Sequence, residues 1–128
     1  MNQKERMLAG LPYKAWLDGL GEARRAAKEM LYDYNHMRPG EVAARQALLR
    51  ALLGKMSEQV NIEQPFYCDY GFNIEIGHNF FANYNCVMLD VARITIGDNV
   101  MCATNVSLLT AGHPLHPQSR NSGYEYGI

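Results

Sequence analysis

The stretch NIEIGHNFFANYNCVMLD, residues 73–90, places its apolar side chains two and four positions apart. A second stretch, RITIGDNVMCATNVSLLT at 93–110, has the same spacing, and both contain Ile-x-Ile-Gly-x-Asn. The residues concerned are Ile74, Ile76, Phe80, Ala82, Cys86 and Met88 in the first block and Ile94, Ile96, Val100, Cys102, Val106 and Leu108 in the second. A helix would scatter these side chains around its circumference, whereas short strands can point all of them inward.

This repeat predicts a parallel β-helix, in which stacked coils bury a continuous core that one coil alone could not bury. The residues expected at or near its corners, where positive φ is tolerated, are Gly77, Asn79, Gly97, Asn99 and Asn105. Three hexads make a coil two residues shorter than the offset of 20 between Ile74 and Ile94, so about two residues near 90–93 should bulge at a corner. The alternative is a pair of similar strands in an ordinary β-sandwich.

The first part of the chain has a different pattern. Apolar side chains recur three and four apart between residues 24 and 34 and again between 42 and 53, and Pro39-Gly40 separates the two runs. This spacing predicts at least two amphipathic helices. We therefore expect a helical N-terminal segment at 1–56 and the first coils of a mainly β domain at 57–128.

Composition excludes some classes of function. The chain has 12 Lys plus Arg and 13 Asp plus Glu, so its net charge of −1 offers no basic surface for nucleic acid or an anionic membrane. No apolar run approaches the roughly 20 residues that span a bilayer, and the charged start lacks the apolar core of a secretory signal. The three cysteines form no Cys-x-x-Cys pair and are expected to be buried, reduced thiols in a cytoplasmic protein.

Five stretches resemble the maltose and galactoside O-acetyltransferases: MLAGLPY at 7–13, LYDYNH at 31–36, CDYGFNIEIGHNFFANYNCVMLD at 68–90, ITIGDNV at 94–100 and TAGHPLHPQSRNSGYEYG at 110–127. The resemblance covers almost the whole chain. It implies a left-handed parallel β-helix with hexapeptide repeats, and transfer of an acetyl group from acetyl-coenzyme A to a hydroxyl of a sugar acceptor. It also implies a homotrimer with active sites in clefts between neighbouring subunits.

The resemblance also implies roles for individual residues. The family's catalytic histidine matches His113, in a loop near 109–127, and its acceptor-binding positions match Asp69, Phe81 and Asn83. Some members have Ser and Tyr at the first two of these acceptor positions. By local chemistry alone, Asp69 could instead cap a turn and Asn83 could be a corner asparagine.

Two departures from the family pattern concern acceptor binding. In some members of the family an acidic residue near the N-terminus contacts the acceptor. The matching position in this sequence is not acidic, and Asp18 is only a nearby substitute. A second acidic position matches Val91, with Asp90 beside it. The identity of the acceptor therefore does not follow from the resemblance.

His113 suits a general base, because an unperturbed imidazole changes charge near physiological pH. Gly112 and Pro114 on either side predict a loop that could carry the side chain into a cleft, although a solvated loop histidine is the plain alternative. The family pattern sets no Ser or Cys nucleophile beside it. We therefore expect direct transfer in a ternary complex, with backbone amides or Asn83 meeting the charge on the thioester oxygen.

A zinc site is an alternative interpretation of the histidines. His78, His113 and His116 could form a three-histidine site like that of the γ-class carbonic anhydrases, which bind zinc at a subunit boundary. The text around His116 resembles the acetyltransferases instead, so we expect no metal.

In the family, the text that matches 121–128 leads into further coils that help to bind coenzyme A, and those coils are absent from this sequence. We expect either a fragment of a longer protein or a naturally shortened relative. The rival to the enzyme is accordingly a truncated, non-catalytic module that trimerises through its β-helix.

Overall fold

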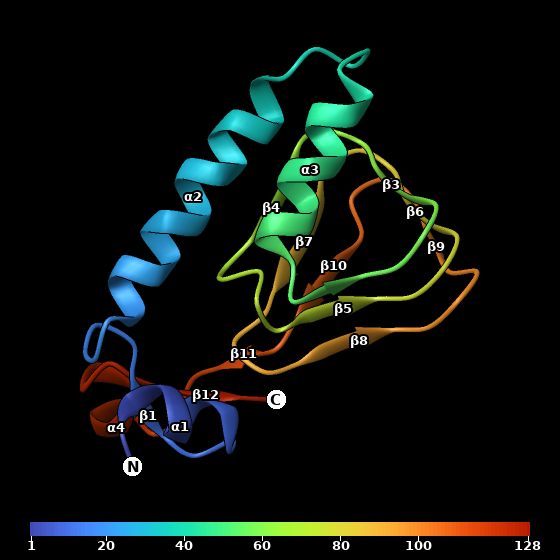
Figure 1. Cartoon of the computed structure of the whole chain (residues 1–128). Coiled ribbons are helices and arrows are strands. Elements are labelled where there is room, and N and C mark those ends of the chain that lie inside the picture. The colour runs from blue at the N-terminus through green and yellow to red at the C-terminus, as the bar shows by residue number, and fades with distance from the viewer.

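The structure, a computed structural model, describes all 128 residues. Residues 55–109 wind through three parallel sheets that form the faces of a triangular prism (Figure 1). Each sheet takes one strand from each of three coils. The sheets are β2 (Lys55–Met56), β5 (Ile74–Ile76) and β8 (Ile94–Ile96); β3 (Val60–Ile62), β6 (Phe80–Ala82) and β9 (Met101–Cys102); and β4 (Phe66–Cys68), β7 (Cys86–Leu89) and β10 (Ser107–Leu109).

The register of these strands confirms the parallel β-helix. Ile74 pairs with Ile94 and Ile76 with Ile96, so the duplicated motif stacks on itself. The six apolar residues of the block at 74–88 are all buried, with exposed fractions of at most 1%. The block at 94–108 is less buried, and its Val100, Val106 and Leu108 pack against the core only in part.

Sequence spacing identified two coils, and the structure has another before them. Val60 pairs with Phe80 and Phe66 with Cys86, so residues 55–73 form the first coil in the same register. Successive coils are offset by 20 residues throughout. The residues by which each coil exceeds three hexads lie at one corner. They fall between β4 and β5 at 69–73, and between β7 and β8 at the predicted corner 90–93.

The corner asparagines behave as predicted. Asn79, Asn99 and Asn105 have positive φ, and the Nδ2 of Asn79 donates to Asn99 Oδ1 of the next coil at 3.0 Å. Gly77 and Gly97 lie beside these corners without positive φ. Gly77 is needed for space instead, because a Cβ there would lie 2.5 Å from Asp98 Oδ1.

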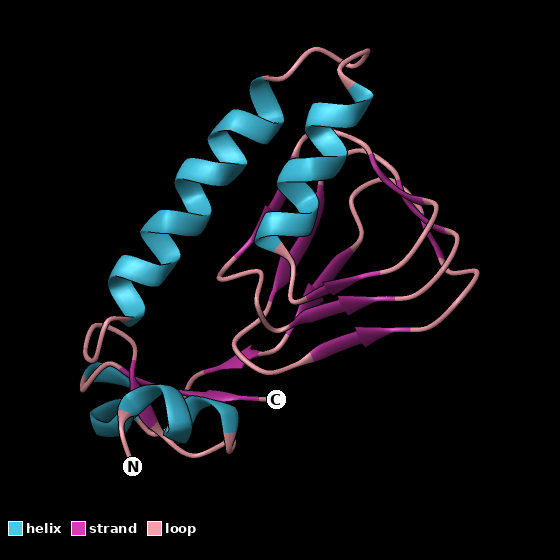
Figure 2. Ribbon diagram, viewed as in Figure 1, coloured by secondary structure: helices cyan, strands magenta, loops and turns pink.

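The N-terminal segment is helical in three separate parts (Figure 2). These are α1 (Gln3–Leu8), α2 (Leu20–His36) and α3 (Val42–Leu52). Residues 9–19 between α1 and α2 are not helical, and they contain the strand β1 (Tyr13–Lys14). Gly10, just after α1, has φ 74°. The last two residues of the predicted segment already belong to β2. None of the helices combines the length and the apolar character that a membrane span would require.

The helices α2 and α3 cover the end of the prism at the first coil (Figure 1). Leu31, Leu49 and Leu52 belong to the same apolar core as the inward residues of the coils. The Tyr34 hydroxyl and the Arg45 guanidinium both donate to the carbonyl of Ile62. These contacts satisfy a carbonyl of the first coil and exclude water from its interior.

Candidate active site

A small antiparallel sheet beside the prism joins distant parts of the chain. Its order is β1, β12 (Tyr124–Gly127) and β11 (Ala111–Gly112), so the N-terminal strand pairs with the C-terminal one (Figure 1). Tyr13 lies opposite Glu125, and Gly112 lies opposite Tyr126. The short helix α4 (Pro117–Asn121) closes the connection from β11 to β12. This sheet fixes both ends of the loop that carries His113.

His113 follows β11 directly and is exposed. The residue before it, Gly112, is buried, and a Cβ there would lie 2.6 Å from the ring of Tyr126. A larger residue would therefore push β11 away from β12 and move His113 with it. The structure places His113 on a loop, as the flanking Gly and Pro predicted. Its role as a base stays a prediction.

Asp69 occupies the bulged corner after β4. Burial raises the pKa of its carboxyl to about 6, and the nearby charge of Asp90 adds to that rise, while Arg24 and Lys28 oppose it. The carboxylate of Glu125 also raises the pKa of Asp69. A carboxyl in this state can accept or donate a hydrogen bond near neutral pH.

The corner at 69–73 is held by Asp90. Its side chain is fully buried and accepts hydrogen bonds from the backbone N–H groups of Asp69, Tyr70, Gly71 and Asn73, at 3.1, 2.9, 2.8 and 3.2 Å. Burial raises the pKa of Asp90, and the backbone donors oppose that rise. All of its oxygens are engaged in the corner, so Asp90 does not replace the acidic acceptor position that Val91 lacks.

The other near substitute, Asp18, is also engaged. It has φ 54°, and its Oδ2 accepts a hydrogen bond from the backbone N–H of Gln3 at 2.8 Å. Its carboxylate therefore binds the start of α1.

Sequence reasoning missed a polar cluster beside Asp69. The Tyr13 hydroxyl donates to Glu125 Oε2 at 2.8 Å, and the Arg24 guanidinium donates to the Tyr70 hydroxyl at 2.8 Å. Burial raises the pKa of Tyr13 strongly, and its hydrogen bond to Glu125 adds to that rise, so its hydroxyl stays a donor. Residues 13 and 125 are far apart in the chain, so no local pattern could have associated them.

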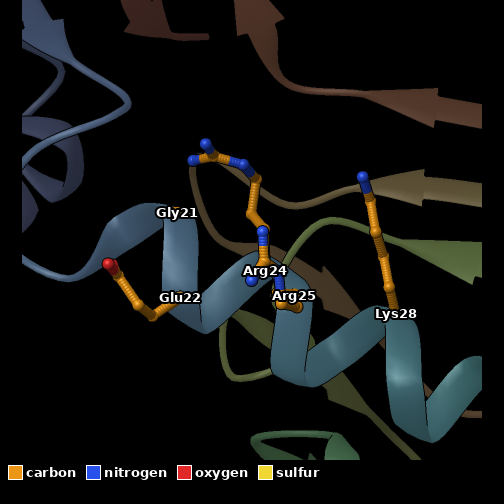
Figure 3. Close-up of a pocket in the computed structure, with 5 residues that line it drawn as sticks. All are labelled: Gly21, Glu22, Arg24, Arg25 and Lys28. Carbon is orange, nitrogen blue, oxygen red and sulfur yellow. The ribbon is translucent and has the colours of Figure 1, made fainter.

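Two pockets flank this region along α2. One, of about 430 Å³, is lined by Asp69 and by residues of α2, β4 and β7, among them Lys28, Tyr67 and Leu89. Figure 3 shows the other, of about 340 Å³, lined by Gly21, Glu22, Arg24, Arg25 and Lys28. Arg24 and Lys28 extend from the same side of α2 in this view, as residues four apart on a helix do. Both pockets are therefore lined by charged side chains, Lys28 being common to the two.

The structure does not bring Phe81 and Asn83 to this cluster. Phe81 lies in β6, on the face formed by β3, β6 and β9, and Asn83 follows at the corner before β7. Asn83 Oδ1 accepts from the backbone N–H of Tyr84 at 2.8 Å. Since β7 runs from that corner to the corner of Asp90, its sheet separates Asn83 from Asp69 within one chain. Asn85 is also a corner residue, with φ 64°, and its Nδ2 donates to Asn105 Oδ1 at 2.9 Å.

The histidines proposed as zinc ligands are distributed over different elements. His78 lies between β5 and β6, and its Nδ1 is 3.3 Å from the backbone nitrogen of Glu58, whereas His116 immediately precedes α4. Within the chain, no three metal-ligating side chains come together. The three cysteines are free and buried, and burial raises the pKa of Cys86 to about 11.

Comparison with known proteins agrees with this geometry. Residues 6–57 match the family model of the maltose acetyltransferase hexapeptide capping motif. The chain is 40% identical to galactoside O-acetyltransferase of Escherichia coli (strain K12) over 128 residues, which are 100% of this chain and 63% of the relative.

Solved structures show the same relationship. A maltose O-acetyltransferase from Clostridium difficile 630 superimposes with a TM-score of 0.97 and 48% identity, over 99% of this chain and 68% of that one. A galactoside acetyltransferase in complex with coenzyme A superimposes with a TM-score of 0.95 and 40% identity, over 100% of this chain and 64% of that one. The chain thus spans about two thirds of the length of these relatives. It belongs to the hexapeptide-repeat acetyltransferase family that contains the maltose and galactoside O-acetyltransferases.

Proposed function

We propose that this protein is an acetyl-coenzyme A-dependent sugar O-acetyltransferase that acetylates a hydroxyl of a maltose- or galactoside-like acceptor. The observation that carries the proposal is the β1, β12 and β11 sheet, which fixes both ends of the loop that exposes His113 to solvent. A relative of the same fold has been solved with coenzyme A, which supports the donor substrate.

In the proposed reaction, His113 takes the proton of the acceptor hydroxyl as its oxygen attacks the thioester carbonyl carbon. The tetrahedral intermediate then collapses, the carbon–sulfur bond breaks, and the imidazolium returns the proton to the leaving thiolate. A positioned base of this kind contributes about 10²- to 10⁴-fold to a rate. The acetyl group passes directly to the acceptor, with no acetyl-enzyme.

Asp69 is proposed to bind acceptor hydroxyls. Its pKa of about 6 means that it can exchange between accepting and donating near neutral pH. Sugar hydroxyls both donate and accept hydrogen bonds, so such a carboxyl suits them. The cations Arg24 and Lys28 favour its charged form.

Phe81 and Asn83 are proposed to contact the acceptor from a neighbouring subunit. Their separation from Asp69 within one chain supports a site shared between subunits, and we propose that the assembly is a homotrimer of left-handed coils. The three free, buried cysteines are in line with a cytoplasmic location, where thiols stay reduced.

The test uses the open reading frame that contains residues 1–128, assayed for coenzyme A release with acetyl-coenzyme A and a panel of maltosides and galactosides. His113→Ala should lower kcat by at least about 10²-fold, whereas His116→Ala in the same loop should retain kcat. Equal rates for the wild type and His113→Ala would remove His113 from its role. Accumulation of an acetyl-enzyme in rapid-quench mass spectrometry would exclude direct transfer.

A further inference from the structure

A third pocket lies beside the small antiparallel sheet, and the proposed reaction does not use it. Its volume is about 640 Å³, larger than that of either pocket along α2. Its walls come from the loop before β1, the loop after His113, α4 and β12. Two prolines, two tyrosines, two serines and one glutamine line this tyrosine pocket, and none of them lines either pocket along α2.

The lining of the tyrosine pocket carries no fixed charge. It includes no Asp, Glu, Lys, Arg or His, whereas the pocket of about 340 Å³ on α2 is lined almost entirely by charged residues. Sites for small uncharged ligands have apolar walls and a few polar groups that fix orientation. Phosphate groups instead bind where Arg or Lys can pair with them, so the tyrosine pocket does not fit the phosphates of coenzyme A.

Two aromatic rings form part of the apolar wall, and contacts within the protein hold both of them. The ring of Tyr126 lies over Gly112, where a Cβ would be 2.6 Å from it. The Nζ of Lys14 lies 5.5 Å from the ring centroid of Tyr124, close enough for a cation–π contact. Both tyrosines are half-buried. Rings that are already ordered lose little further entropy when a ligand packs on them.

Polar groups line the same pocket as these rings. Gln118 and Ser119 of α4 are exposed, so an amide and a hydroxyl are available for hydrogen bonds. A pyranose ring matches this arrangement, because its C–H groups form an apolar face and its hydroxyls lie around the edge. The C–H face can pack on a tyrosine ring while the hydroxyls pair with the amide and the serine.

The tyrosine pocket is continuous with the loop of the proposed base. Pro114, which lines the pocket, directly follows His113, and consecutive Cα atoms are about 3.8 Å apart. Gly112, directly before His113, lies under the ring of Tyr126. One linked molecule can therefore place a hydroxyl at His113 and a neighbouring sugar unit in the pocket.

We infer that the tyrosine pocket binds the sugar unit of the acceptor next to the one that is acetylated, so the preferred acceptor is an oligosaccharide rather than a single sugar. The inference rests on the proposed function, in which His113 takes the proton of an acceptor hydroxyl. No bond is made or broken in the pocket. Contacts to the second sugar unit are the same before and during transfer, so they lower KM and leave kcat unchanged.

The kinetic test compares glucose with maltotriose as acceptors, for the wild type and for Tyr124→Ala. Stacking of one ring on an aromatic side chain contributes about tenfold in affinity. In the wild type, KM for maltotriose should therefore lie about tenfold below KM for glucose. Tyr124→Ala should remove this difference, while kcat and the KM for glucose change by less than about threefold. Tyr124→Phe keeps the ring and should retain the difference.

Two kinetic results would overturn the inference. One is a ratio of the two KM values that is the same in the wild type and in Tyr124→Ala. The other is an equal rise in KM for glucose and maltotriose, which would mean that the substitution disturbs the loop of His113 rather than a separate sugar contact.

A binding measurement separates this inference from the proposed function. Calorimetric titration of maltotriose, without acetyl-coenzyme A, should give a dissociation constant about tenfold lower for the wild type than for Tyr124→Ala. Leu115→Ala is the matched control, because Leu115 is 92% exposed in the same loop and does not line the pocket. That variant should bind maltotriose as the wild type does.

Absence of acetyl transfer in the wild type would defeat the proposed function, and the titration would still test the pocket. A proline-rich peptide, which aromatic-lined grooves of other proteins bind, should give no heat of binding. Binding of that peptide in place of maltotriose, or equal affinity for maltotriose in the wild type and Tyr124→Ala, would refute the inference.

Discussion

Replacement of Asp90 by Asn tests the corner that carries Asp69. The carboxylate accepts four backbone N–H groups, two on each oxygen. Asn has nearly the same shape, but its NH₂ group is a donor and would face two of these N–H groups. Two bonds to a charged acceptor are lost, at about 1.5 kcal/mol each, so the unfolding free energy should fall by about 3 kcal/mol.

The assay is equilibrium unfolding in urea at one fixed protein concentration. With a slope of about 1.5 kcal/mol per molar urea, the loss corresponds to a midpoint about 2 M lower. Asp98→Asn is the matched control, because its Oδ1 accepts a single bond, from the N–H of His78 at 2.7 Å in an exposed corner. That variant should lose less than about 1 kcal/mol.

The outcome that refutes this reasoning is a midpoint for Asp90→Asn equal to that of Asp98→Asn. It would mean that the four bonds do no more than offset the cost of burying the charge. That cost is visible in the pKa of Asp90, which burial raises. If Asp90→Asn raised only the KM for the acceptor and left the unfolding free energy unchanged, Asp90 would shape the corner without stabilising the fold.

Three further predictions follow from single contacts. Gly112→Ala places a Cβ 2.6 Å from an aromatic carbon of the opposite strand and should cost about 2 kcal/mol in urea unfolding, whereas Gly97→Ala meets nothing within 4 Å and should cost less than half of that. The folded-state pKa of Asp69, raised to about 6, lies above its unfolded value near 3.8, so its contribution to stability is full at acidic pH and is lost as pH rises through about 6. Wild-type unfolding free energy should therefore decline more steeply than that of Asp69→Asn between these values, and parallel curves would contradict the burial of this carboxyl. Asn85→Ala must keep φ near 64° and lacks the bond to Asn105, so its unfolding free energy should fall by about 2 kcal/mol. Asn85→Gly also lacks the bond but adopts positive φ without strain, so it should lose less. Equal losses in the two variants would assign the cost to the side-chain bond.

The β-helix could be predicted from sequence because its signal is local. Inward residues recur two and four apart, and the burial of Ile74, Ile76 and Phe80 follows from alternation along each strand. The corner asparagines were predictable for a similar reason, since positive φ is a property of single residues. The first coil was harder to recognise: Val60, Ile62 and Phe66 keep the spacing, but the Ile-x-Ile-Gly motif is missing.

For the candidate site, the sequence supplied residues through resemblance but not their arrangement. It singled out His113 and Asp69 and left Asp90 as a mere neighbour of Val91. The buried role of Asp90 depends on four N–H groups about 20 residues earlier in the chain, which only the stacking of one coil on the next brings into reach.

By itself, then, the sequence determined that the chain winds into parallel coils with asparagine corners, because side-chain periodicity sets which face is buried. The tertiary structure alone decided that Tyr13, Glu125 and the strand before His113 share one sheet. Pairing between strands 112 residues apart depends on backbone hydrogen bonds and shape, which leave no spacing in the sequence from which to infer it.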